Sequence, residues 1–408
     1  MILYYIFAVV LMLVQGLVLV EAYRHLIYTL RKYRPKDSDY KPPVVLIAPC
    51  KGLDTAFDQN MESFFQQDYP DYEILFVVES REDPAYRRLA EILERLQARG
   101  NRVPARILVA GLARTSSQKV HNLLAACEAA SKDREVFAFV DSDVCLKRHW
   151  LRALVHPLRR SDFGASTGYR WFVPTDGRLS SHVLSAINAY VASLLGPHPW
   201  NSAWGGSMAI RREMFDKIRL AETWRKAFTD DYTLTYLVKK ENLPIAFVPA
   251  CFVASYEGMS WRELFSFARR QFIITRVYMP RLWWLAAAGL GHYLAGFWIG
   301  VGVTAYLLRQ SSSQASLAAV LPAVLWLLSM IKGLTRQVMI GKILPEDRKR
   351  LRISAVIDIF FQPLVSAFTL CCVLAAGFTR KIRWRGICYH LIDADHMEIE
   401  TNRLVADS

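Results

Sequence analysis

The sequence predicts an α/β domain with a largely parallel sheet, placed between membrane-spanning helices at both ends of the chain. Apolar residues make up 53% of the 408 residues, and they concentrate at Ile2–Val20 and again after Trp283. Residues 43–253 have the composition of a soluble domain, in which short apolar runs alternate with helical patterns. Such alternation is typical of parallel strands joined by crossover helices.

The segment Ile2–Val20 is long enough to cross a bilayer, because about 20 apolar residues span the hydrocarbon core. No basic residue lies before it and no small-residue cleavage site follows it, so we expect an anchor and not a cleaved signal peptide. A basic connector follows, and Lys and Arg beside a span mark its cytosolic side. Its cations are Arg24, Arg31, Lys32, Arg34 and Lys36.

The net charge of +14 would also suit a nucleic-acid-binding protein. In this chain, however, many of the cations flank apolar segments, so we expect a membrane surface and no nucleic acid as the partner. The seven cysteines are scattered and form no CxxC pair, which favours reduced thiols in a cytosol-facing protein.

Within the soluble region, the first half shows regular alternation and the second half is less regular. The predicted strands are Val44–Ala48, Glu73–Val78, Arg106–Val109 and Val136–Val140. Helices are expected around Asp58–Gln66, Pro84–Arg99, Lys119–Ala130, Leu179–Leu195 and Asp230–Lys240. Ligands of parallel sheets bind beyond the carboxyl ends of the strands, so the residues that follow these strands are the candidates for function.

The last third of the sequence predicts an interfacial helix and further membrane segments. Trp261–Tyr278 places apolar residues at helical spacing against arginines, a pattern typical of a helix in the head-group plane. Apolar segments follow at about 283–308, 317–331 and 356–378, and Asp358, Gln362 and Pro363 predict that the last is broken into a re-entrant or hairpin form. The expected order is a transmembrane helix (1–22), the connector (23–42), a catalytic domain (43–258), the amphipathic helix (259–280), a transmembrane region (281–379) and a cytosolic tail (380–408).

Asp141-Ser142-Asp143 is the sharpest chemical motif, because it emerges directly from an apolar strand. Two carboxylates at this spacing can share a divalent cation with a phosphorylated ligand. Asp231, before a predicted helix, is the candidate base for a hydroxyl group, and Asp230 would orient or cap.

At three further positions the sequence allows two interpretations, one functional and one structural. Glu79 closes a strand where a nucleotide base and ribose would lie, or it belongs to a charged loop. Lys119 precedes a helix and would contact phosphate, or it is a solvated helix start. Trp204-Gly205-Gly206 would admit a sugar or an acceptor closely, or it is an ordinary turn.

In this order the motifs resemble family 2 glycosyltransferases, and among them the ceramide glucosyltransferases and their bacterial relatives. The resemblance spans most of residues 44–280 and the tail motif Ile382–Tyr389. Its other motifs are Leu46–Asp54, Phe64–Ile74, Asp83-Pro84-Ala85, Lys119–Leu123, Asp141-Ser142-Asp143, Gly205-Gly206-Ser207 and Asp230-Asp231-Tyr232.

The resemblance implies a GT-A type fold, Rossmann-like with a mixed sheet, and metal-dependent transfer that inverts the anomeric carbon. Asp143 and Asp141 would hold Mg²⁺ or Mn²⁺, and Asp231 would be the catalytic base. The family's nucleotide-binding Asp is replaced here by Glu79. Its late Arg-Trp pair is Gln271-Phe272 in this chain, so contact with the donor diphosphate would pass to Arg269, Arg270 or Arg276.

The expected activity is therefore the transfer of one sugar from a nucleotide sugar, UDP-linked by preference, to the hydroxyl of a membrane lipid such as ceramide. The alternatives are a polyprenyl-phosphate sugar transferase, a processive polysaccharide synthase and an inactive membrane scaffold. We expect an integral multi-pass membrane protein whose catalytic domain faces the cytosol, in a bacterial inner membrane and not in the Golgi.

Overall fold

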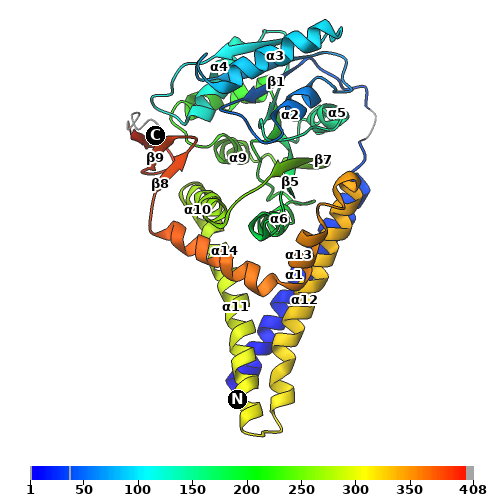
Figure 1. Ribbon diagram of the computed structural model, residues 1–408, viewed down its shortest axis with the longest axis vertical. Coiled ribbons are helices and arrows are strands. Elements are labelled where there is room, and N and C mark those ends of the chain that lie inside the picture. The colour runs from blue at the N-terminus through cyan, green and yellow to red at the C-terminus, as the bar shows by residue number, and fades with distance from the viewer. Residues whose placement is uncertain (1, 36–37, 401–408) are drawn as a thin grey trace. The chain divides into compact units, whose positions relative to one another are not determined.

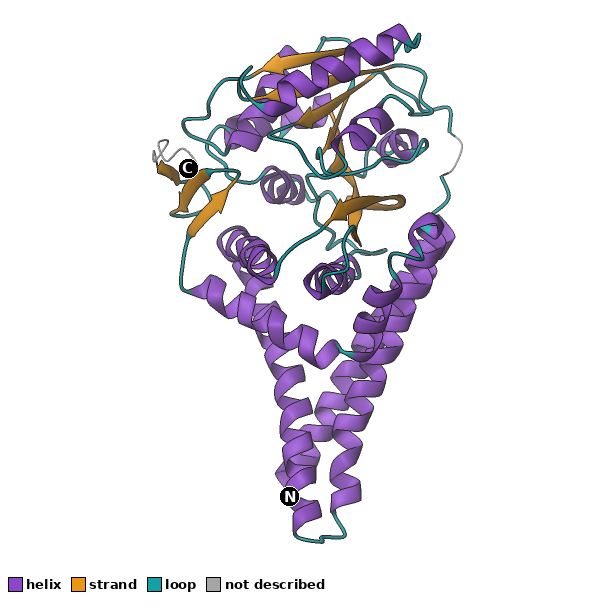
Figure 2. Cartoon of the chain, in the orientation of Figure 1, coloured by secondary structure: helices purple, strands orange, loops and turns teal. Residues whose placement is uncertain are grey.

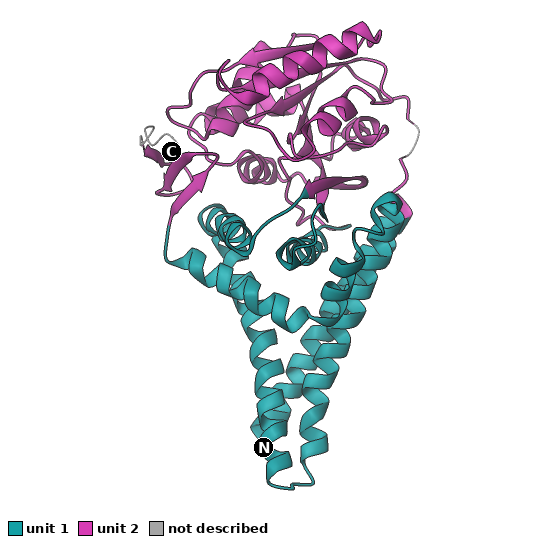
Figure 3. Ribbon diagram, in the orientation of Figure 1, with its two compact units in different colours: residues 1–30, 172–197, 257–379 teal, residues 31–171, 198–256, 380–408 magenta. Residues whose placement is uncertain are grey.

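The computed structural model describes residues 2–35 and 38–400, and the chain divides into two compact units (Figures 1 and 3). Unit 1 comprises residues 1–30, 172–197 and 257–379, and unit 2 comprises residues 31–171, 198–256 and 380–408. Residues 36 and 37 of the predicted connector and residues 401–408 of the predicted tail lie outside the described part of the chain.

A seven-stranded mixed sheet forms the centre of unit 2. Its order is β3-β2-β1-β4-β6-β5-β7, in which β1 to β4 pair in parallel and β6 is antiparallel to both β4 and β5. The strands are β1 (Val44–Pro49), β2 (Tyr72–Val78), β3 (Ala105–Val109), β4 (Val136–Val140), β5 (Ala165–Pro174), β6 (Ser207–Arg211) and β7 (Ile245–Glu257).

Helices cover both faces of this sheet (Figure 2). Strand β1 shows why its sequence is continuously apolar: Val44, Leu46 and Ala48 pack into one hydrophobic cluster, and Val45 and Ile47 pack into another on the opposite face. The helices of unit 2 are α2 (Phe57–Phe64), α3 (Pro84–Ala98), α4 (Gln118–Ala129), α5 (Trp150–Val155), α7 (Arg212–Lys217), α8 (Leu220–Trp224) and α9 (Asp230–Lys240), with a 3₁₀ turn at His156–Arg159.

Unit 2 also contains a small antiparallel sheet from the carboxy-terminal part of the chain. Its order is β10-β9-β8, built from β8 (Lys381–Trp384), β9 (Ile387–Leu391) and β10 (Met397–Glu400). The sequence was expected to form only a tail here, and the short length of each strand explains why no strand pattern is evident.

Unit 1 is helical, and three of its described helices are long and apolar enough to cross a membrane. These are α1 (Ile2–Lys32), α11 (Pro280–Arg309) and α12 (Ala315–Ile343), whose facing side chains form a shared apolar cluster. The other elements are α6 (Leu179–Ala192), α10 (Trp261–Tyr278), a 3₁₀ turn (Pro345–Asp347), α13 (Arg352–Phe360) and α14 (Gln362–Gly377).

The predicted break in the last apolar segment is present. Helices α13 and α14 are separated at Phe361 and bent by 87° relative to each other. Pro363 lies in the first turn of α14, where its missing N–H is tolerated. The pair is a broken span or a re-entrant loop by its geometry.

Candidate active site

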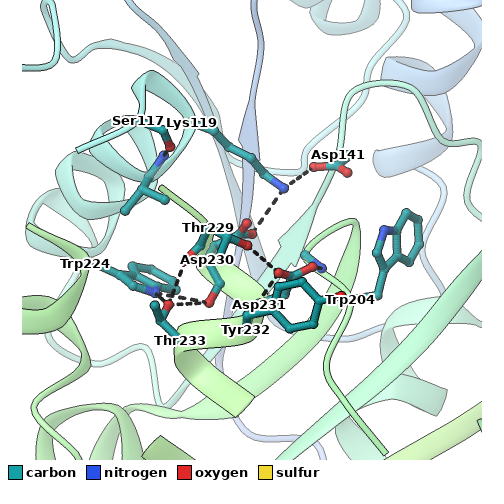
Figure 4. Close-up of polar contacts among 12 residues, drawn as sticks. Ser117, Lys119, Asp141, Trp204, Trp224, Thr229, Asp230, Asp231, Tyr232 and Thr233 are labelled. Carbon is teal, nitrogen blue, oxygen red and sulfur yellow. Dashed lines mark hydrogen bonds and ion pairs between the residues drawn. The ribbon is translucent and has the colours of Figure 1, made fainter. Parts of the chain in front are cut away.

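An ion-pair cluster lies at the carboxyl end of strand β4 (Figure 4). Asp141 follows β4, and its Oδ1 is 2.7 Å from Nζ of Lys119; the same ammonium is 3.1 Å from Oδ2 of Asp230. Lys119 stands in the first turn of α4, where Ser117 caps the helix by accepting from the amide of Val120. The structure therefore brings together three residues that lie far apart in the sequence, and Lys119 is not a solvated helix start.

The charges in this cluster are not balanced. Burial lowers the pKa of the Lys119 ammonium, but Asp141, Asp230 and Asp231 outweigh it, so the pKa is held above its ordinary value and the lysine stays charged. Burial raises the pKa of Asp230 to about 6, against the opposing charge of Lys119. One cation thus faces three carboxylates, and the site has negative charge to spare for a further cation.

Asp231 is held in a fixed orientation at the start of α9. Its Oδ1 accepts from the hydroxyl of Thr229 at 2.5 Å and from the amide of Tyr232 at 2.7 Å. Its Oδ2 accepts from the amide of Gly205 at 3.2 Å. Three donors orient the carboxylate without a paired cation on either oxygen, which suits a group that takes a proton from a substrate.

Asp143 carries a buried oxygen, Oδ1, that has no hydrogen-bond partner. Its other oxygen is 3.2 Å from Nη1 of Arg170, whose guanidinium also lies 5.3 Å from the centre of the Trp204 ring. Burial raises the pKa of Asp143 to about 6, although Arg170 opposes this. Sequence reasoning missed Arg170, because the segment that forms β5 was expected to be irregular.

The acidic residues at this edge fit a divalent cation that arrives with phosphate. Among residues 2–35 and 38–400, no three His, Cys, Asp or Glu side chains gather into a complete metal site. Mg²⁺, however, is commonly held by one or two carboxylates together with substrate phosphates and water. Asp141 and the unpartnered oxygen of Asp143 supply such a pair of ligands.

Glu79 stands at the end of β2 and forms an ion pair with Lys51 through Oε1, while Oε2 is buried without a hydrogen-bond partner. Its side chain is only 16% exposed, which excludes the interpretation as a solvated charged loop. Lys51 belongs to the motif after β1 and was not assigned a role from the sequence.

Gly205 and Gly206 allow the chain to pass close to the cluster. A methyl group on Gly205 would overlap the carboxylate of Asp230 and lie 2.8 Å from Nζ of Lys119. On Gly206 it would collide with the ring of Trp204 and lie 2.7 Å from Oδ2 of Asp141. The close packing of this loop against the cluster therefore requires glycine at both positions, and a contact with a sugar or an acceptor stays a prediction.

The three arginines predicted to contact the donor lie in α10, in unit 1. Arg276 donates to the backbone carbonyls of Gly377, the last residue of α14, and of Thr379. The guanidinium groups of Arg269 and Arg270 lie over the rings of Phe265 and Phe267 respectively. Their contact with a diphosphate stays a prediction.

Comparison with known protein families matches residues 4–396 to "Glycosyl transferase family 21". Among curated proteins, the chain is 31% identical over 169 residues to a ceramide glucosyltransferase of Komagataella phaffii, and 34% identical over 114 residues to ceramide glucosyltransferase 1 of Caenorhabditis elegans. These segments cover 39% and 28% of this chain, and the chain spans only 32% and 23% of the length of those relatives.

Two solved structures show weaker likeness. A mannosyltransferase of Pyrobaculum calidifontis in complex with GDP-Man and Mn²⁺ is 16% identical, with a TM-score of 0.48 over 92% of this chain and 97% of that one. Glucosyl-3-phosphoglycerate synthase of Mycobacterium tuberculosis, with Mn²⁺ and UDP-glucose, is 15% identical, with a TM-score of 0.38 over 60% and 84% of the two chains.

Proposed function

The chain belongs to glycosyl transferase family 21, and we propose that it moves a single sugar from a nucleotide sugar to the hydroxyl of a membrane lipid. The resemblance to glycosyltransferases of the ceramide glucosyltransferase type is confirmed, with family 21 as the family that matches. The fold prediction is confirmed as well, since a mixed α/β sheet of the expected type is combined with helices apolar enough to span a membrane.

The observation that carries the proposal is the cluster in which Lys119 pairs with Asp141 and Asp230, beside the oriented carboxylate of Asp231. In this proposal Glu79 binds the donor's ribose through its unpartnered oxygen, and Asp141 and Asp143 face the diphosphate. A bound Mg²⁺ or Mn²⁺, held by these two aspartates, would neutralise the charge of the departing nucleoside diphosphate.

The chemical step requires one proton transfer and one displacement. Asp231 accepts the proton of the acceptor hydroxyl as its oxygen forms a bond to the anomeric carbon. The bond from that carbon to the diphosphate breaks on the opposite face, so the configuration inverts. Lys119 pairs with Asp141 and Asp230 and offsets part of their negative charge, while the hydrogen bonds from Thr229 and Gly205 hold Asp231 in position.

A lipid acceptor is proposed because of the helices of unit 1. Extracting lipid tails into water costs about 0.8 kcal/mol for each CH₂ group, so a lipid hydroxyl is best used at the bilayer surface. Helix α10 carries four arginines and exposes Trp261, as expected of a helix in the head-group region. The curated relatives are named ceramide glucosyltransferases, which makes ceramide the first acceptor to test.

We further propose that unit 2 faces the cytosol of a bacterial cell. The support is the distribution of cations: Arg31 and Lys32 lie in the last turn of α1, Lys342 lies in the last turn of α12, and Arg348, Lys349 and Arg350 lie between α12 and α13. Residues 310–314, which join α11 to α12, would then lie outside. A cysteine introduced at Ser313, in a background without the exposed Cys371, should react with an impermeant maleimide in sealed cells. Labelling only after lysis would reverse the topology.

A labelled-donor screen tests the proposed activity. The purified protein in lipid nanodiscs is given UDP-sugars with Mn²⁺ and either ceramide, diacylglycerol or polyprenyl phosphate, and the products are separated by thin-layer chromatography. We expect one glycolipid that carries a single sugar. A ladder of products would indicate a polymerase, transfer only to polyprenyl phosphate would change the acceptor class, and donor binding without turnover would indicate a scaffold.

A further inference from the structure

The carboxy-terminal sheet is anchored on the catalytic domain, within unit 2, by Tyr389 of β9. Tyr389 is 1% exposed, and its hydroxyl accepts from the backbone amide of Gln118 at 3.3 Å. Its ring packs edge to face on Phe228, with 5.1 Å between the ring centres. Gln118 begins α4 and Phe228 precedes the acids of α9, so the sheet is attached beside the two helix starts that supply Lys119 and Asp230.

The tight turn between β8 and β9 directs one arginine to the strand ends. Arg385 and Gly386 both have positive φ, 50° and 79°, as a two-residue hairpin turn requires. The guanidinium of Arg385 forms an ion pair with Asp54, and its Nη1 is 3.7 Å from the position that a Cβ on Gly52 would occupy. The turn between β8 and β9 thus reaches the loop that follows β1.

Asp54 joins this arginine to the acidic motif after β4. The hydroxyl of Ser142 donates to Oδ2 of Asp54 at 2.7 Å, while Arg385 pairs with Oδ1. Ser142 stands between Asp141 and Asp143, so Arg385 is connected through Asp54 and Ser142 to the segment that holds the two proposed metal ligands. The side chain of Asp54 is 8% exposed, whereas that of Arg385 is 37% exposed and accessible to a ligand.

Three further cations of unit 2 face carboxylates, as Arg385 does. Lys119 pairs with Asp141 and Asp230, Lys51 pairs with Glu79, and Arg170 pairs with Asp143. A donor diphosphate would bring further negative charge into a site that already has an excess of acids. A guanidinium has five N–H donors in a planar fork, so it can bind phosphate oxygens along one edge while another edge faces a carboxylate.

We propose that the carboxy-terminal hairpin is part of the donor site and that Arg385 binds the diphosphate of a nucleoside diphosphate. This inference rests on the proposed function, because it takes a nucleotide sugar as the donor. Asp54 orients the guanidinium before the donor arrives, and Tyr389 fixes the hairpin to the domain. Arg385 is therefore a donor-binding residue supplied by a segment almost 250 residues after Asp141 in the chain.

Calorimetric titration of the full-length protein with UDP and UMP, each with Mn²⁺, tests this assignment. Arg385→Gln should lower the affinity for UDP at least tenfold and the affinity for UMP threefold or less, because the second phosphate is the group that loses its partner. Arg385→Lys keeps the positive charge but lacks the planar guanidinium, so its affinity for UDP should lie between those of the wild type and Arg385→Gln. The matched control is Arg383→Gln, an exposed arginine of β8 in the same hairpin, which should bind both ligands as the wild type does.

The outcomes separate this inference from the proposed function. If the wild type binds UDP and Arg385→Gln binds it with the same affinity, the role of Arg385 is overturned and the donor assignment stands. Equal weakening of UDP and UMP, with a lowered melting temperature, would make the hairpin a structural latch only. If Arg385→Gln fails to fold, the ratio of UDP to UMP affinity in Arg385→Lys decides. A wild-type protein that binds no nucleoside diphosphate would overturn both.

Discussion

Each of the two units contains a buried cluster of charged side chains, and the two clusters differ in how completely they are satisfied. In unit 1, Arg336 of α12 pairs with Asp358 of α13, and both side chains are at most 5% exposed. Oδ1 of Asp358 accepts from Arg336 at 2.6 Å and from Gln362 at 2.7 Å. Its Oδ2 accepts from Arg336 at 3.1 Å and from Gln337 at 2.8 Å. One charge balances the other, and each carboxylate oxygen has two donors.

The cluster in unit 2 is incomplete by the same criteria. Lys119 faces Asp141, Asp230 and Asp231, and buried oxygens of Asp143 and Glu79 have no hydrogen-bond partner. Buried polar groups are normally satisfied, because leaving one unpaired costs free energy. The contrast teaches that the complete cluster fixes helices to one another, whereas the incomplete one supports the proposal of a ligand that supplies the missing cation and donors.

The largest effect is expected from breaking the complete cluster. Asp358→Ala leaves the guanidinium of Arg336 buried without a counter-charge, and removal of one partner of a buried pair typically costs about 3–5 kcal/mol. We expect a low yield of folded protein and a lowered melting temperature in detergent. Arg336→Gln with Asp358→Asn should recover part of the loss. Glu346→Ala, at an exposed acid of the turn after α12, is the control. Unchanged stability of Asp358→Ala would remove the distinction between the clusters.

A substitution at Asp231 in the incomplete cluster should reduce turnover without reducing the stability of the protein. Asp231→Asn keeps the shape of the side chain and removes its basicity, so turnover should fall by ~10² or more, equivalent to about 2.7 kcal/mol. Donor and Mn²⁺ affinity, measured by calorimetry, should change little. Asp216→Asn, an exposed residue of α7, provides the matched control. If Asp231→Asn retains wild-type turnover, another group is the base.

Much of this architecture follows from local sequence patterns. The strands β1, β2 and β4 are buried on both faces and appear as apolar runs, and Asp141 and Glu79 were located because they follow such runs. Helix α9 begins at Asp230, and α10 covers Trp261–Tyr278, as the spacing of apolar residues predicts.

What escaped prediction depends on contacts between distant segments. Strand β6 pairs with β4 and β5, and its apolar run, Met208–Ile210, is only three residues long. Arg170 and Lys51 acquire their partners only when the sheet forms, and Arg385 meets Asp54 across 331 positions of sequence. No local pattern encodes such pairings.

The fall in donor affinity at acidic pH tests whether Asp143 is a metal ligand. Its pKa is raised to about 6 by burial, so at pH 5 only about one molecule in ten carries the carboxylate, and a metal ligand must be deprotonated. Affinity for UDP with Mn²⁺ should therefore fall about tenfold, or about 1.4 kcal/mol, between pH 7 and pH 5. Asp143→Asn should bind weakly at both values, without this dependence.

The stability of the metal-free protein should fall as the pH rises, whereas its affinity for the donor should rise. A carboxyl whose folded pKa is raised contributes stability below its unfolded pKa, and the contribution is lost as the pH rises through about 6. The metal-free wild type should thus lose melting temperature relative to Asp143→Asn between pH 4 and pH 7. A parallel pH profile for the two proteins in both measurements would contradict the assignment.

The smallest effect is expected at Glu79, a further acid of unit 2 that has a buried oxygen without a hydrogen-bond partner. Glu79→Gln retains one carbonyl oxygen and removes the negative charge, so one hydrogen bond to a ribose hydroxyl weakens by about 1 kcal/mol, roughly fivefold in affinity. Because the ribose is common to both ligands, the affinities for UDP and UMP should fall equally in calorimetric titration, unlike the selective loss expected for Arg385→Gln.

Loss of the ion pair with Lys51 would also act on the loop after β1, so the prediction needs a control. Lys51→Gln separates the two effects: if Glu79 binds ribose directly, Lys51→Gln should weaken both ligands less than Glu79→Gln does. Equal effects of the two variants would make Glu79 a partner of Lys51 and not a donor ligand.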